Sequence, residues 1–402
     1  MSSHTPMQLS ISTKAQHGAA TMHPAAGLTP PVTPTIENDR TSVSGSTAAR
    51  AVTSTSTGGH TVAGFCPLAF CDHLEYQRDH EGRLKEFGRG AWSVVRVAFA
   101  SPRADTIVRP FTPPSSPTPA SRVVAVKSPA RRDGCAVLQA EALTLTRACS
   151  VLGSERHIVR FHGFIADSNS IVMSAVPLPL SKYIEDKARF AEENKTTRNM
   201  FEPVQGMAQW HDLAKKLITS LSWIHSQALI IHGDIKPHNI LLKPRMSIDD
   251  DASSTEFAYE PLFADFSSAH PISPSETAPA GAQTALTPPF TAPEILTSLL
   301  SSPDTPPTPA SDVFSLAVTL LAVATGDLLL YPSQRRLLMS KNGHQVIEFV
   351  QSGHSGARVP KNGHVEKILR PAVTKNPDER IQPQAWLDQF FPWDSERHCQ
   401  LL

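Results

Sequence analysis

A carboxylate, an ammonium group and a side-chain amide lie within six consecutive residues in the segment 232–242, HGDIKPHNILL. These groups belong to Asp234, Lys236 and Asn239. Apolar triplets on both sides would anchor the ends of the segment in a core, so we expect a short, well-held loop between them. Such a loop could hold a general base, a phosphate-neutralising cation and a metal ligand against one reacting group.

Two further charged residues end apolar strands. Asp265 follows the apolar run 261–264 (PLFA), and Lys127 ends the run 123–127 (VVAVK). An unpaired charge at the end of a buried strand is costly, so each side chain needs a partner. A magnesium ion would suit the carboxylate, and a phosphate together with an acidic side chain would suit the ammonium group.

Composition excludes several classes of protein. The formal net charge is +0 over 402 residues, and no run rich in Lys or Arg occurs, so we expect no nucleic-acid partner. The five cysteines form no CxxC pair, which fits a reducing compartment. The sequence shows no signal peptide and no apolar stretch long enough for a transmembrane helix. We therefore expect a cytoplasmic protein, with nuclear and membrane-associated locations left open.

The segment 83–99 (RLKEFGRGAWSVVRVAF) predicts two strands around a glycine turn. The turn has the pattern G-x-G-x-x-S-x-V, from Gly88 to Val95. Glycines let a backbone approach phosphate closely and point its N–H groups at the oxygens. Taken alone, this motif is more typical of an ordinary hairpin.

Three helices are predicted around these residues. In 135–150, Glu141 falls inside the apolar stripe and should meet a cation, although a surface glutamate is the alternative. The segment 209–227 is amphipathic and leads into the loop. The segment 311–326 is apolar nearly all round, which indicates a buried helix capped by Ser311 or Asp312 and ended by Gly326.

The segment 232–242 resembles the catalytic loop of eukaryotic protein kinases, H-R-D-x-x-x-x-N, with Gly233 in place of the arginine. Other motifs of the family occur in the family's order between residues 85 and 391. They are the glycine turn 88–95, V-A-V-K at 124–127, Glu141, D-F-S at 265–267, T-P-P-F-T-A-P-E at 287–294, D-V-F-S at 312–315 and Arg380.

This resemblance implies an α+β, bilobal protein kinase-like fold. The N-lobe, an antiparallel sheet plus one helix, would span 65–176 and carry a Pro-rich insert at 101–121. The mainly helical C-lobe would span 177–393. The Ser/Thr/Pro-rich segment 1–64 is predicted to be disordered, and 394–402 forms a C-terminal tail.

The resemblance also implies the site residues of an enzyme that uses ATP and Mg²⁺. The catalytic residues would be Asp234 as base, Lys236 beside the transferring phosphoryl group, and Thr287 bridging these two. The ATP-binding residues would be Gly88, Gly90, Ser93, Val95, Ala125, Lys127, Glu141, Ser174 and Val176. The magnesium ligands would be Asn239 and Asp265. Met173 would be the gatekeeper residue before the hinge.

The function expected from the resemblance is phosphoryl transfer from ATP to a Ser or Thr hydroxyl of a protein substrate, by a monomer. Because Gly233 carries no charge to bind a phosphate, we expect no need for activation-loop phosphorylation. One alternative is a pseudokinase or scaffold in which Gly233 and Ser267, the latter replacing the glycine of D-F-G, mark lost activity. Another is a kinase for small molecules or lipids, which the match at 287–294 disfavours.

The last four residues, Cys399 to Leu402, fit the C-a-a-X pattern for geranylgeranylation. No polybasic run and no second cysteine lie nearby, so one prenyl chain would give weak, reversible membrane association. A chance terminal cysteine is the alternative.

Overall fold

The computed structural model describes residues 66–103, 121–197, 199–245, 257–273, 286–298 and 305–390. The predictions for the segment 1–64, for most of the insert 101–121 and for the tail with Cys399 lie outside these residues. No helix in the described ranges combines the length and the apolarity needed to cross a membrane.

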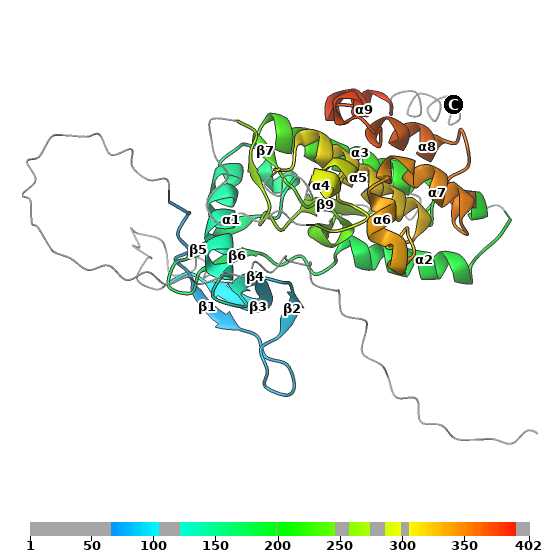
Figure 1. Ribbon diagram of the computed structural model, residues 1–402. Coiled ribbons are helices and arrows are strands. Elements are labelled where there is room, and N and C mark those ends of the chain that lie inside the picture. The colour runs from blue at the N-terminus through cyan, green and yellow to red at the C-terminus, as the bar shows by residue number, and fades with distance from the viewer. Residues whose placement is uncertain are drawn as a thin grey trace, which may run out of the picture. The chain divides into compact units, whose positions relative to one another are not determined.

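A six-stranded antiparallel sheet forms the first part of the fold (Figure 1). Its strands are β1 (His73–Tyr76), β2 (Glu86–Arg89), β3 (Ser93–Ser101), β4 (Arg122–Pro129), β5 (Phe161–Ile165) and β6 (Ser170–Ser174). Their order is β1-β3-β4-β6-β5, and β2 also pairs with β3. Strands β2 and β3 flank the glycine turn as predicted. The register pairs Lys127 with Val95 on one side and with Ile171 on the other.

Helix α1 (Gly134–Cys149) packs against this sheet and carries Glu141. Its apolar face, including Leu138, Ala142 and Leu145, joins the main core with residues of β5 and β6. Glu141 is 1 % exposed. The predicted helix is therefore present, and its glutamate points into the interior rather than into solvent.

The second part of the fold is mainly helical (Figure 1). Its α-helices are α2 (Leu180–Glu193), α3 (Met207–Ser226), α4 (Pro293–Ser298), α5 (Pro309–Thr325), α6 (Arg336–Ser340), α7 (Val346–Ser352), α8 (His364–Leu369) and α9 (Pro383–Asp388). Short 3-10 turns connect them, among them η4 (Pro237–Asn239). Two small ribbons complete this part: β7 (Ile230–Ile231) with β10 (His270–Pro271), and β8 (Ile240–Pro244) with β9 (Tyr259–Phe263).

Helices α3 and α5 form the centre of the helical part. The predicted apolar face of α3 is fully buried, and the Trp210 indole donates to the Leu320 carbonyl of α5 (3.0 Å). Gly326 ends α5 in the left-handed conformation, as predicted (φ 78°). The predicted N-cap was wrong, because Thr308 caps α5 in a capping box with Ser311.

The α+β class, with an antiparallel sheet and a larger helical part, is confirmed.

Candidate active site

One buried carboxylate on α5 anchors the backbone of the loop that carries Asp234. Asp312, 1 % exposed, accepts hydrogen bonds from the backbone N–H groups of His232 (2.7 Å) and Gly233 (3.0 Å). Its Oδ2 also lies 3.0 Å from His225 Nε2 on α3. Burial alone would raise the pKa of Asp312, but these hydrogen bonds and the neighbouring imidazoles lower it. The carboxylate therefore stays ionised and holds the loop backbone from two sides.

Gly233 is required by its surroundings. Its φ is +77°, a left-handed conformation that side chains disfavour. A Cβ at this position would lie 2.7 Å from the Ser268 carbonyl oxygen and 3.3 Å from Pro307. The Ser268 backbone, which follows β9, thus occupies the space that an arginine in this conformation would need.

Asp234, Lys236 and Thr287 form one hydrogen-bonded cluster. Lys236 Nζ donates to Asp234 Oδ2 (2.7 Å) and to Thr287 Oγ1 (3.1 Å), and Thr287 Oγ1 donates to Asp234 Oδ1 (3.1 Å). Asn239 Nδ2 donates to two oxygens of Asp234, the backbone carbonyl oxygen and Oδ2, both at 2.9 Å. Both carboxylate oxygens of Asp234 are therefore fixed in direction by neighbouring groups.

A backbone link joins this loop to the strand that ends in Asp265. The Ala264 N–H donates to the Asn239 carbonyl (2.9 Å), and His232 Nε2 lies 3.1 Å from the Ala264 carbonyl. Asp265 itself has φ +61°, an uncommon conformation for a residue other than glycine. Strained backbone of this kind persists only where the surrounding structure holds it.

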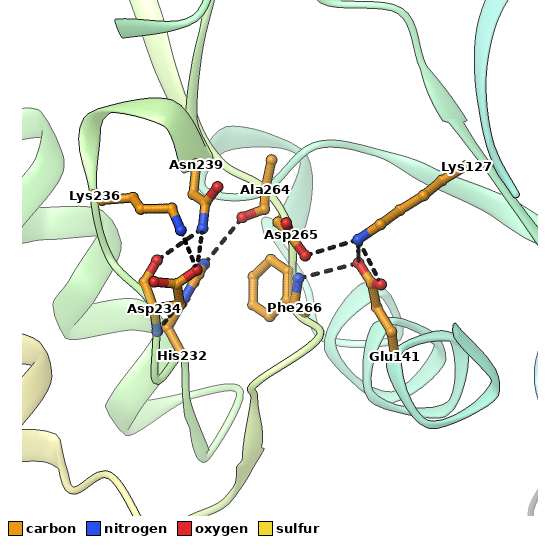
Figure 2. Close-up of polar contacts among 9 residues, drawn as sticks. All are labelled: Lys127, Glu141, His232, Asp234, Lys236, Asn239, Ala264, Asp265 and Phe266. Atoms are coloured by element: carbon orange, nitrogen blue, oxygen red, sulfur yellow. Dashed lines mark hydrogen bonds and ion pairs between the residues drawn. The ribbon is translucent and has the colours of Figure 1, made fainter. Parts of the chain in front are cut away.

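The ammonium group of Lys127 lies between the carboxylates of Glu141 and Asp265 (Figure 2). Lys127 Nζ donates to Glu141 Oε1 (2.9 Å), Glu141 Oε2 (2.7 Å) and Asp265 Oδ1 (2.7 Å). Burial would lower the pKa of Lys127, but the two carboxylates outweigh it and raise that pKa above its usual value. Burial raises the pKa of Glu141, whereas the pKa of Asp265 is lowered, because Lys127 outweighs the effect of burial.

Figure 2 shows Asp265 between the Lys127–Glu141 pair and the loop residues Asp234, Lys236 and Asn239. The Phe266 N–H donates to Glu141 Oε1 (3.1 Å), and the Phe266 ring lies 4.8 Å from the His232 ring. The structure thus brings together five charged or amide side chains that are far apart in the sequence. They are Lys127, Asp234, Lys236, Asn239 and Asp265.

The glycine turn leaves room for a ligand. A Cβ added to Gly88 would meet nothing within 4 Å, and one added to Gly90 would meet only the Ser93 carbonyl, at 3.9 Å. Neither glycine has a positive φ. Neither packing nor backbone conformation explains these glycines, so close approach of a phosphate group remains a physical reason for them.

Four of the remaining predicted nucleotide contacts lie on this sheet: Ser93, Val95, Ala125 and Ser174. Val95 pairs with Lys127 across β3 and β4, and Ala125 pairs with Met173 across β4 and β6. Ser174 ends β6, and its N–H donates to the Arg160 carbonyl (2.9 Å). Val176 follows two residues later, outside the strand.

Asn239 and Asp265 suit a magnesium ion. Both hydrogen bonds of the Asn239 amide come from Nδ2, so Oδ1 keeps its lone pairs for a cation. The Asp265 side chain is 40 % exposed, although Lys127 is nearly buried beside it. Proteins usually bind Mg²⁺ through one or two carboxylates together with substrate phosphates. The two oxygens fit that chemistry.

A buried fork ties the end of the T-P-P-F-T-A-P-E segment to the last part of the chain. Arg380 donates to Glu294 Oε1 and Oε2, both at 2.7 Å, and to the Ala310 carbonyl (2.9 Å). Sequence reasoning missed His225, the third partner of Asp312, because no pattern in α3 distinguishes it from a surface histidine.

Together, an antiparallel sheet with a buried lysine and a larger helical part with a polar loop are the features of a protein kinase domain. The family model for the protein kinase domain matches residues 118–391. Because this match covers more than half of the chain, the protein belongs to the protein kinase family, as predicted. A search of curated proteins finds no match to the chain. The glycine turn lies before the matched residues.

Proposed function

We propose that this protein is a serine/threonine protein kinase that transfers the γ-phosphoryl group of ATP to hydroxyls of protein substrates. The observation that carries the proposal is the cluster of Asp234, Lys236 and Thr287, in which a carboxylate and an ammonium group are held 2.7 Å apart. One can accept the proton of the substrate hydroxyl, and the other can neutralise charge on the phosphoryl group.

The nucleotide would lie against the sheet. Lys127, oriented by Glu141, would bind phosphate oxygens, while the glycine turn 88–95 would cover the triphosphate. Asn239 and Asp265 would hold Mg²⁺, which neutralises the phosphate charge when bound. Catalysis would then rest on positioning and charge neutralisation rather than on a covalent intermediate.

Two features support serine or threonine as the acceptor. The segment 287–294 resembles the corresponding segment of Ser/Thr kinases, and Thr287 contacts both Asp234 and Lys236. The test is a degenerate peptide array with Ser, Thr or Tyr acceptors and radiolabelled ATP. We expect label on Ser and Thr peptides and its loss in Lys127→Met. Label on Tyr peptides would refute the acceptor assignment, and Mg-ATP binding without any transfer would favour the scaffold alternative.

We also propose that the enzyme needs no phosphate on its activation segment. Gly233 has no side chain to bind such a phosphate, and the Ser268 carbonyl occupies the adjoining space. His270, 9 % exposed, instead contacts the Pro307 carbonyl through Nε2 (3.1 Å) and helps to hold the start of this segment. Phosphatase-treated enzyme should keep its activity, and a nearly complete loss would contradict the proposal.

A further inference from the structure

The residues just before β1 form an additional edge of the sheet. We call residues 66–72 the N-terminal strap. The Leu68 carbonyl accepts from the Phe164 N–H (2.7 Å), and the Phe70 N–H donates to the Phe164 carbonyl (3.0 Å). This parallel pairing of Ala69 with Phe164 covers β5, the last strand in the sheet order (Figure 1). The strap therefore protects an otherwise open edge.

Strand β5 is shaped to receive the strap. Gly163 has φ +144°, and a Cβ there would lie 2.7 Å from the Phe70 nitrogen and 2.9 Å from the Ala69 carbonyl carbon. Any larger residue at 163 would push the strap away. The Phe70 ring, in turn, packs on the outer cluster of the sheet, which includes Val124 and Val172.

The strap also contacts α1. The Leu68 N–H donates to Thr146 Oγ1 (3.0 Å), and this hydroxyl donates in turn to the Ala142 carbonyl one turn earlier in the helix (2.7 Å). Leu68 therefore binds β5 through its carbonyl and α1 through its N–H. Glu141 lies on the same helix, five residues before Thr146. A shift of α1 relative to the sheet would move Glu141 relative to Lys127, which lies on β4.

We propose that the N-terminal strap positions α1 for catalysis by connecting Thr146 to the edge of β5, which keeps Glu141 within reach of Lys127. This inference rests on the kinase function proposed above. It assigns a functional role to residues that precede the family match at 118–391. Thr146 and Gly163 act here as positioning residues, and neither touches the predicted nucleotide site.

Threonine variants of α1 test the proposal. Thr146→Val keeps the side-chain shape but removes the acceptor for Leu68, whereas Thr146→Ser keeps the acceptor. Thr144→Val is the matched control, because the Thr144 hydroxyl donates to the Ala140 carbonyl (3.2 Å) within the same helix. For each full-length variant, kcat and the KM for Mg-ATP are measured per folded molecule at a temperature well below unfolding.

We expect Thr146→Val to lower kcat by about 2- to 10-fold, the range that loss of one hydrogen bond provides. Thr146→Ser should restore kcat, and Thr144→Val should resemble the wild type. Hydrogen exchange should become faster in α1 and in the strap of Thr146→Val. A wild-type kcat in Thr146→Val, or an equal loss in Thr144→Val, would overturn the proposal.

Gly163→Ala is the stronger perturbation, since it places a methyl group against the strap backbone. We expect it to lower kcat per folded molecule further than Thr146→Val does. An unchanged kcat while the strap amides exchange freely would refute a positioning role. A wild-type enzyme without any kinase activity would instead refute the proposed function, and hydrogen exchange in α1 would still test the contact between strap and helix.

Discussion

Replacing Asp312 with asparagine should weaken the support of the loop that carries Asp234. The carboxylate accepts two backbone N–H groups, from His232 and Gly233, and also contacts His225. The side chain of asparagine has one oxygen and one NH₂ group in place of two carboxylate oxygens. One of the two backbone N–H groups would therefore face the NH₂ group and lose its acceptor. Because an unsatisfied buried donor costs about 1–3 kcal/mol and the remaining bonds lose their charged acceptor, we expect the free energy of unfolding to fall by about 2–4 kcal/mol.

Urea denaturation of Asp312→Asn at pH 7 measures this loss, and peptide phosphorylation measures its effect on Asp234, which directly follows Gly233. We expect activity per folded molecule to fall as well, because the loop backbone loses its hydrogen bonds to the Asp312 carboxylate. A wild-type unfolding midpoint together with wild-type activity would refute the claim that Asp312 supports the loop.

The pH dependence of the same variant gives an independent check. The pKa of Asp312 is lowered in the folded protein, so its contribution to stability is complete above the unfolded pKa of about 3.9 and is lost as the pH falls through the folded value. The difference in unfolding free energy between wild type and Asp312→Asn should therefore shrink in strong acid. A constant difference down to the lowest pH at which both proteins fold would contradict this account.

Three further variants test other parts of the structure. Gly233→Ala should lower the unfolding free energy by about 1–3 kcal/mol in urea titrations, because it strains a left-handed residue and crowds the Ser268 carbonyl; a stability equal to the wild type would contradict this. Arg380→Lys cannot form the fork to Glu294 and should cost about 2–4 kcal/mol by the same measurement, whereas a neutral effect would show that the fork is dispensable. Burial and two neighbouring arginines lower the pKa of His162 to about 4, so protonation favours the unfolded chain and wild-type stability should fall between pH 6.5 and about 4; His162→Gln should flatten that decline.

The order of motifs along the chain predicted which residues come together better than any single motif could. Asp234, Asn239 and Asp265 lie in segments whose apolar flanks fix them in a core, and Lys127 ends the buried run 124–127 within β4. Each group therefore had a place that polarity and strand pattern could identify. Glu141 was ambiguous from sequence alone, because a helical glutamate is usually exposed; its buried position depends on how α1 packs on the sheet.

Two features of the structure were not predicted from the sequence, the start of α5 and the pairing of the strap with β5. A T-P-A-S capping box opens at Thr308, so α5 begins before Ser311 and Asp312, the two residues that the sequence suggested as caps. The carboxylate of Asp312 binds the catalytic loop instead of capping its own helix. The strap at 66–72 has no regular alternation of apolar residues, so the sequence gives no sign of a strand there. Its pairing with β5 depends on the close approach of the two backbones at Gly163.

The most direct test of the account compares wild type and Asp234→Asn for two quantities, Mg-ATP affinity and phosphate transfer to a Ser/Thr peptide. The account predicts that both proteins bind Mg-ATP with similar affinity, because Asp234 is assigned to the acceptor hydroxyl, and that only the wild type transfers phosphate at an appreciable rate. Transfer that survives in Asp234→Asn, or a wild type that binds Mg-ATP without transferring phosphate, would contradict the assignment of this loop as catalytic.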